Sequence, residues 1–120
     1  MNVKNPIIET CRKSGKNCLK FTFGARITAR EAAEAIVEWQ KAFQSDENEP
    51  MTLIWDCRDM KAYESQARTQ WTHALKKMKP QIEAIWLITN SPFIKMGASV
   101  MGMLSSLEIN IVSDEREIVA

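Results

Sequence analysis

The sequence predicts a single α/β domain spanning residues 1–120, with a mixed β-sheet, parallel strands at its centre and flanking helices. Two apolar runs, residues 51–55 and 82–88, end at polar residues and are followed by stretches with helical periodicity. A strand that is apolar on both faces belongs in a sheet covered on both sides, and such sheets are usually parallel. A chain of 120 residues is long enough for one core and too short for two domains.

The first strands form a predicted hairpin. A two-residue turn at residues 14–15 pairs Ile8 with Phe21. This register gathers the apolar side chains on one face, whereas a slip of one residue would scatter them. Cys11 and Cys18 then lie opposite each other on the outward face, where we expect free thiols in a cytoplasmic chain.

Two amphipathic helices flank the first apolar strand. A capping box at Thr28 and Glu31 begins the first helix, which carries Trp39 in its buried stripe. After the strand, a loop at residues 57–64 leads to a second helix that ends before Pro80. The apolar face of the second helix consists of Ala67, Trp71, Ala74, Leu75 and Met78.

The third helix begins at Ser91, a predicted N-cap, with Pro92 in the first helical position. A short strand at residues 108–112 and a final turn follow. The predicted order is therefore β-β-α-β-α-β-α-β, which right-handed crossovers arrange as one mixed sheet. Apolar spacing predicts that the third helix buries Phe93, Met96, Gly97, Val100, Leu104 and Leu107.

The opposite face of the third helix lacks charged residues, although a solvated helix face normally carries lysine or glutamate. Small and methionine-rich surfaces pack closely against partners or adapt to apolar ligands. Two interpretations remain open: the face is a contact surface, or the hairpin or the C-terminal turn buries it. The predicted outward residues are Ala98, Ser99, Met101, Gly102, Ser105 and Ser106.

Composition argues against several classes of function. Sixteen basic and fifteen acidic side chains leave a net charge of +1, so no global field attracts nucleic acid. No uncharged run reaches the roughly 18 residues of a transmembrane helix, and no signal-peptide region follows the first residues, so we expect a cytoplasmic protein. Three cysteines without a C-x-x-C pair and one histidine argue against a disulfide scaffold or a metal site.

Few residues are candidates for ligand binding, modification or catalysis. Asp56 ends a central strand, where open α/β sheets place ligand groups, but it could equally cap the loop or pair with Arg58. Asp59 completes this strand-end loop. Ser65 is either the N-cap of the second helix or a modified residue, because a helix start accommodates a phosphate. His73 has no partner at a suitable spacing and is expected to be solvated.

Residues 54–60, Ile-Trp-Asp-Cys-Arg-Asp-Met, and residues 85–88, Ile-Trp-Leu-Ile, resemble segments of the STAS superfamily, especially its anti-sigma-factor-antagonist-like (STAS/Sec14-like) branch. The resemblance covers nearly the whole chain and implies a STAS-like fold. In classical members a phosphorylatable serine follows the strand-end aspartate by nine residues, as Ser65 follows Asp56, although residues 66–68 lack the glycine context. The branch is thought to hold or sense apolar ligands, and its molecular function is unassigned.

These observations favour a non-enzymatic domain, without a cofactor or a metal, that binds a protein partner or a second copy through its third helix. The alternative is a carrier or sensor of an apolar, lipid-like molecule held between the second and third helices. Ser65 is a candidate phosphosite. The candidate surface and ligand residues are Trp71, Met78, Met96, Ser99, Met101, Gly102, Met103 and Ser105.

Overall fold

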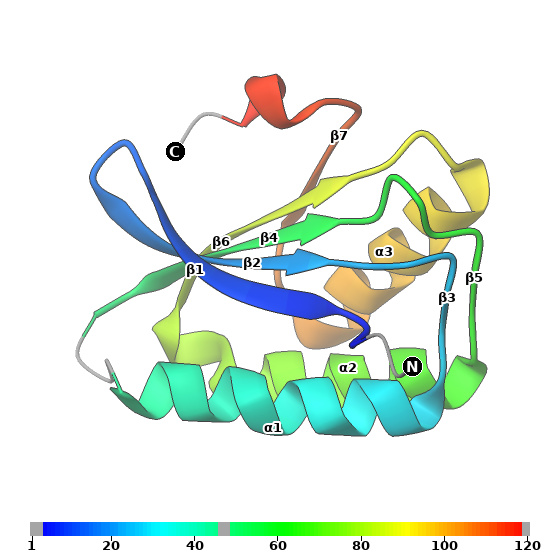
Figure 1. Cartoon of the computed structure of the whole chain (residues 1–120), viewed down its shortest axis with the longest axis horizontal. Coiled ribbons are helices and arrows are strands. Elements are labelled where there is room, and N and C mark those ends of the chain that lie inside the picture. Colours follow the sequence, from blue (N-terminus) through cyan, green and yellow to red (C-terminus); the bar gives the residue numbers. More distant parts are fainter. Residues whose placement is uncertain (1–3, 46–48, 119–120) are drawn as a thin grey trace.

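A five-stranded sheet in the order β1-β2-β4-β6-β7 forms the centre of the structure, a computed structural model that describes residues 4–45 and 49–118 (Figure 1). β1 pairs antiparallel with β2, and every other neighbouring pair in this sheet is parallel. The prediction of a mixed sheet with the two apolar runs central and parallel is confirmed. The strands are β1 (Ile7–Lys13), β2 (Lys16–Thr22), β4 (Met51–Asp56), β6 (Ile82–Ile88) and β7 (Ile109–Val112).

The hairpin has the predicted register. Ile8 pairs with Phe21 and Cys11 pairs with Cys18 across a turn in which Ser14 and Gly15 both have positive φ. The two cysteines are free thiols, as expected. Their expected outward exposure is wrong for Cys18, which is 1% exposed. It is buried because the far face of the sheet is covered as well.

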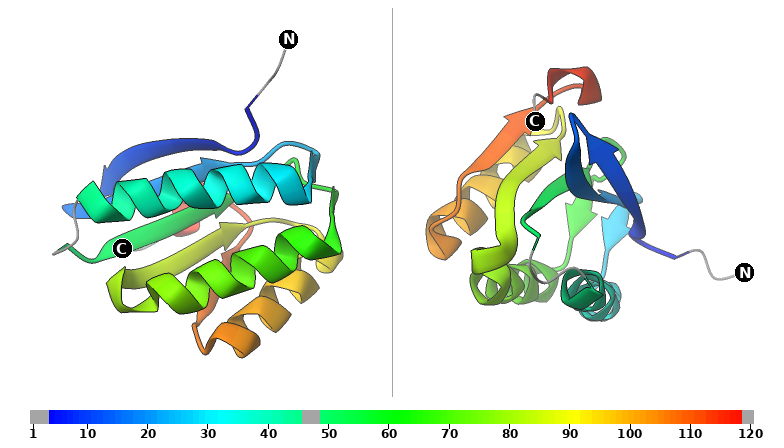
Figure 2. Two further views of the ribbon diagram at one scale, coloured as in Figure 1. Left: turned by 90° about the horizontal axis from the view of Figure 1, so that it is seen from below. Right: turned by 90° about the vertical axis from the view of Figure 1, so that its left-hand side faces the viewer.

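Three helices cover one face of the sheet: α1 (Ala29–Ser45), α2 (Ser65–Met78) and α3 (Pro92–Ser105) (Figure 2). The other face has no helical layer among the described residues and is covered by the chain after β7, which includes η2 (Glu115–Glu117). Ile54, Ile88 and Cys18 form a small apolar cluster there, with Ile118 packed against it. The apolar strands are therefore buried on both faces, but helices account for only one of the two covers.

The capping box at the start of α1 is present, because Glu31 N donates to Thr28 Oγ1 at 3.1 Å and Thr28 N donates to Glu31 Oε1 at 2.9 Å. The predicted buried face of α2 is also confirmed, and all five of its residues are buried. Trp71 lies at the centre of the core on this side. Its ring lies 5.2 to 6.1 Å, centroid to centroid, from the rings of Trp39, Phe21, Phe23 and Trp55.

The loop at residues 57–64 contains a short strand that the sequence pattern does not predict. β5 (Ala62–Tyr63) pairs in parallel with β3 (Arg26–Ile27) and forms a second, two-stranded sheet beside the ends of the main strands (Figure 1). Two residues are too few to show an alternating pattern, so this pairing leaves no periodic signal. It places Tyr63 directly against α3.

The predicted inward face of α3 is wrong for its large side chains, although Gly97 is buried as predicted. Phe93, Met96 and Leu104 are 50%, 65% and 57% exposed, although the apolar spacing assigned them to the core. Ala98, Gly102 and Ser105, which the pattern places outward, are buried, whereas Ser99 and Ser106 are exposed as predicted. Small side chains lie inward because α3 runs close to its neighbours. A Cβ at Gly97 would lie 2.4 Å from the hydroxyl oxygen of Tyr63 in β5.

Candidate functional site

An apolar cavity of about 60 Å³ lies between α2 and α3, over β4 and β6. An engineered cavity of about 150 Å³ is large enough for benzene. The cavity in this conformation is therefore too small for a lipid chain. Its walls are Phe23, Ile27, Trp55, Cys57, Met60, Tyr63, Ala67, Arg68, Trp71, Leu87, Ile94, Gly97, Ala98 and Met101.

Two of the predicted ligand residues, Trp71 and Met101, line this cavity. Met78 is buried but is not part of its wall, and Met96 and Met103 lie on the exposed side of α3. Sequence periodicity misses the contribution of the loop before α2, because its apolar residues do not repeat at helical spacing.

Tyr63 is the most important of these missed residues. Its ring stacks on Phe93 with 5.1 Å between centroids, and its hydroxyl lies over Gly97, where a Cβ would be only 2.4 Å away. The guanidinium of Arg68 lies 5.8 Å from the ring centroid on the α2 side. Tyr63 thus connects the two helices that form the walls of the cavity.

The indole of Trp55, a residue of the cavity wall, carries a hydrogen-bond donor without a partner among the described residues. Trp55 is 2% exposed, and its Nε1 has no acceptor among the described residues. Trp39 shares this property, but it is not part of the cavity wall. A buried donor without an acceptor costs about 1–3 kcal/mol.

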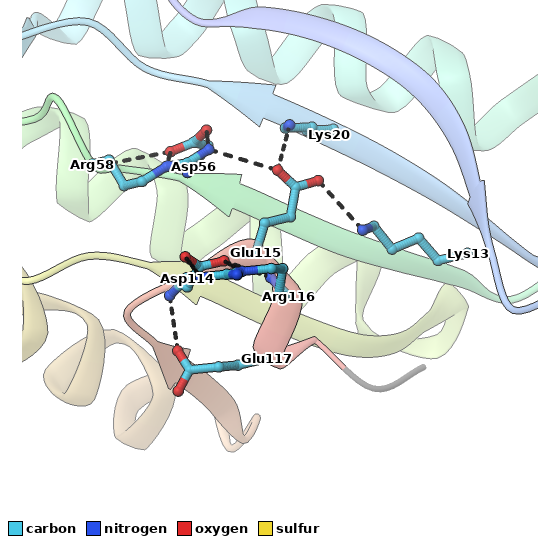
Figure 3. A network of polar contacts seen from close by, with 8 residues as sticks. All are labelled: Lys13, Lys20, Asp56, Arg58, Asp114, Glu115, Arg116 and Glu117. Atoms are coloured by element: carbon cyan, nitrogen blue, oxygen red, sulfur yellow. Dashed lines mark hydrogen bonds and ion pairs between the residues drawn. The ribbon is translucent and has the colours of Figure 1, made fainter.

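The strand-end loop forms an ion-pair network at the far face of the sheet (Figure 3). Arg58 donates from Nε and NH2 to the two carboxylate oxygens of Asp56, at 2.9 and 2.6 Å. These side-chain hydrogen bonds lower the pKa of Asp56. The structure therefore shows the alternative in which Asp56 pairs with Arg58, whereas Asp59 is exposed beside them.

Glu115 of η2 connects this loop to the hairpin. Its carboxylate lies 3.0 Å from Nζ of Lys20, 3.4 Å from Nζ of Lys13 and 3.6 Å from NH2 of Arg58 (Figure 3). The hydrogen bond from Lys20 is the main reason that the pKa of Glu115 is lowered. These contacts fasten the segment of residues 113–118, here called the C-terminal strap, across the sheet.

The thiols show no sign of activation. Burial raises the pKa of Cys57 and raises that of Cys11 to about 12. A thiol is nucleophilic as its thiolate, so a raised pKa makes it less reactive near neutral pH. The carboxylates of Asp56 and Glu115 are held in ion pairs.

Ser65 is exposed and is the first residue of α2, but the predicted N-cap role is wrong. The N-cap is Glu64, and its carboxylate accepts a hydrogen bond of 2.6 Å from the backbone N–H of Ala29 in α1. Glu64 therefore links the starts of two helices. Phosphorylation of Ser65 stays a prediction. His73 is exposed on α2, as expected.

An exposed apolar surface lies on α3. We define the α3 stripe as Phe93, Met96, Val100, Met103 and Leu104. Four of these side chains are 50% to 77% exposed, and Val100 between them is half-buried. Within residues 4–45 and 49–118, no helix has the length and apolar character that a membrane span requires.

No protein-family model matches the sequence. No curated protein matches it significantly. The solved structures include a clear relative in fold, described as an uncharacterized protein from the DUF3478 family with a SpoIIAA-like fold from Shewanella loihica PV-4. The two chains superpose with a TM-score of 0.76 at 13% sequence identity, over 98% of this chain and 93% of the other. The chain therefore has the SpoIIAA-like fold, the fold of the STAS superfamily.

Proposed function

We propose that this protein is a non-enzymatic interaction domain that binds a protein partner through the α3 stripe. The carrying observation is the exposure of four large apolar side chains on one side of one helix. Side chains of this size present roughly 200 Å² each when free, so the stripe offers about 500 Å² of apolar surface. Patches of this size on soluble domains are often binding sites.

The flanks of the stripe support the same function. Lys95 is the one charged residue within α3, and small or polar residues occupy most other positions. A partner that covers the stripe would therefore desolvate few charges, which lowers the cost of association. The raised thiol pKa values and the paired carboxylates support a role other than acid–base or nucleophilic catalysis.

The test is a double substitution of the two most exposed methionines, Met96→Glu with Met103→Glu. Both side chains point away from the core, so the free energy of unfolding should change little while partner capture and self-association are lost. Sedimentation velocity and quantitative pull-down with the purified protein measure the two kinds of binding. Gln66→Glu with His73→Glu on α2 is the matched control, because it adds the same charge to exposed positions. Unchanged binding in the α3 variant would contradict the proposal.

A second function is favoured by the cavity between α2 and α3. The protein would hold or sense a small apolar molecule that carries one acceptor oxygen for the indole N–H of Trp55. Native mass spectrometry of protein purified from its own host tests this. The expected result is a bound mass that disappears in Ala98→Val, which fills the cavity from α3. A clean apo mass would count against a carrier role.

A further inference from the structure

We propose that the occupant of the α3 stripe is the α3 stripe of a second copy of this chain, packed antiparallel about a two-fold axis beside Val100. This inference rests on the proposed function, because it names the partner of the same surface. It assigns the protein a symmetric dimer in which each copy contributes the same residues. A two-fold interface of this kind requires a surface that is complementary to itself.

The spacing along α3 meets that requirement. Met96 and Leu104 lie four residues on either side of Val100. An antiparallel pair centred on Val100 therefore sets Val100 against its own copy and Met96 level with the partner's Leu104. Apolar residues meet apolar residues at each of these levels. Spacings of three and four residues are also those of a helix–helix seam.

Charge fixes the direction of the pair. Lys95 lies near the start of α3, and Glu108 lies just beyond its end. Both are exposed, and neither forms an ion pair within residues 4–45 and 49–118. An antiparallel arrangement brings Lys95 of each copy toward the partner's Glu108, whereas a parallel arrangement brings the two Lys95 side chains together. Lys95 lies about 140° around the helix from Val100 and is therefore off the seam, so these charges act between the adjoining ends of the two helices, where opposite signs favour the antiparallel orientation.

The apolar area that the two stripes can bury limits the affinity of the dimer. About 500 Å² of apolar surface from each copy gives roughly 1,000 Å² in total, which is at the low end of specific interfaces. A reversible dimer is the expected form. Sedimentation velocity from about 1 µM to about 500 µM protein should therefore show the sedimentation coefficient rising with concentration.

The geometry is tested by Val100→Cys, because a residue beside the two-fold axis meets its own copy. Oxidised glutathione is the oxidant: the two introduced thiols, one from each copy, give up two electrons and two protons and form one disulfide, and glutathione disulfide is reduced to two glutathione thiols. We expect a cross-linked dimer on a non-reducing gel. The matched control is Ser99→Cys, an exposed position one residue away that faces off the seam. The unsubstituted chain reports any cross-linking by the native cysteines.

A charge exchange tests the direction. Lys95→Glu and Glu108→Lys should each weaken the dimer about fivefold, and the double variant should restore it. Equal effects of all three variants, or a dimer that Val100→Cys does not cross-link, would overturn the antiparallel arrangement. A protein that is monomeric at every concentration would overturn the dimer itself. If the protein is monomeric but Met96→Glu with Met103→Glu abolishes capture of another protein, the proposed function stands and only the dimer is refuted. If the double variant also leaves capture unchanged, both are refuted.

Discussion

The helices α2 and α3 are both 14 residues long and pack side by side on the same face of the sheet, but they bury opposite kinds of residue (Figure 2). α2 turns Trp71 and Leu75 inward and exposes charged residues. α3 turns Gly97 and Ala98 inward and exposes Met96. Hydrophobicity determines the orientation of α2, whereas close steric fit determines that of α3. A helix with two apolar faces has no single inward side that its periodicity can identify.

The largest expected effect tests the α2 half of this comparison. Trp71→Ala removes the ring that contacts Trp39, Phe21 and Trp55, and it should lower the free energy of unfolding by about 3–5 kcal/mol. Chemical denaturation followed by circular dichroism measures the change. Gln66→Ala on the exposed side of α2 is the control. A loss below about 1 kcal/mol would mean that the aromatic cluster does not position α2.

A smaller effect tests the α3 half. Gly97→Ala places a methyl group 2.4 Å from the present position of the Tyr63 hydroxyl, so the ring has to move. The steric cost exceeds the roughly 1 kcal/mol that alanine gains over glycine within a helix, and we expect a net loss of about 1 kcal/mol. Tyr63→Phe in the same chain should recover most of that loss in a double-mutant cycle, because it removes the nearest atom. A net gain of stability in Gly97→Ala would contradict the steric account.

The C-terminal strap differs from both helices, because ion pairs of Glu115 hold it against the sheet whereas apolar and steric packing holds the helices. Glu115→Gln should cost about 1 kcal/mol near neutral pH. The folded-state pKa of Glu115 lies below its ordinary value of 4.5, so the contribution is present above that value and is lost as the pH falls through the folded-state pKa. The midpoint temperatures of thermal unfolding of the unsubstituted protein and of Glu115→Gln should therefore differ at neutral pH and converge at strongly acidic pH. Glu34→Gln, at an exposed ion pair on α1, should show little difference at any pH. A constant difference for Glu115→Gln across the range would refute the electrostatic origin.

The smallest expected effect separates the two sides of α3. Met103→Glu, at a side chain that is 77% exposed, should change the free energy of unfolding by less than about 0.5 kcal/mol. Met101→Glu, two residues earlier in the cavity wall, should cost several times more because it introduces a charge between α2 and α3. Guanidinium denaturation of the two variants gives the comparison directly. Equal costs would mean that α3 is oriented differently in solution.

Local signals predict much of this fold. The hairpin register follows from one turn and an alternating pattern, and the start of α1 follows from a capping box. The buried strands β4 and β6 follow from continuous apolar runs, because each is covered on both faces. These features depend on residues close together in the sequence or on burial that composition reveals.

The rest depends on contacts between distant residues. Glu64 caps α1 from 35 positions away, so no local pattern identifies it. The inward face of α3 depends on Tyr63, which belongs to a strand of two residues. The C-terminal strap depends on Glu115 reaching lysines in the hairpin. A cavity lies between α2 and α3, where the carrier hypothesis puts its ligand, and Trp71 and Met101 are the residues of the predicted wall that line it.

The contact between Tyr63 and Gly97 also acts as a rotational stop. Turning α3 by one residue, about 100°, would bring Ala98 or Met96 under the tyrosine ring in place of the glycine. Either residue carries a Cβ where the glycine has none, so the close contact with Tyr63 disfavours such a rotation. This contact lies at the edge of the stripe, because Tyr63 covers Gly97 and also stacks on Phe93, and it helps to hold the stripe outward. Met96, Met103 and Leu104 can then vary without disturbing the direction in which they point.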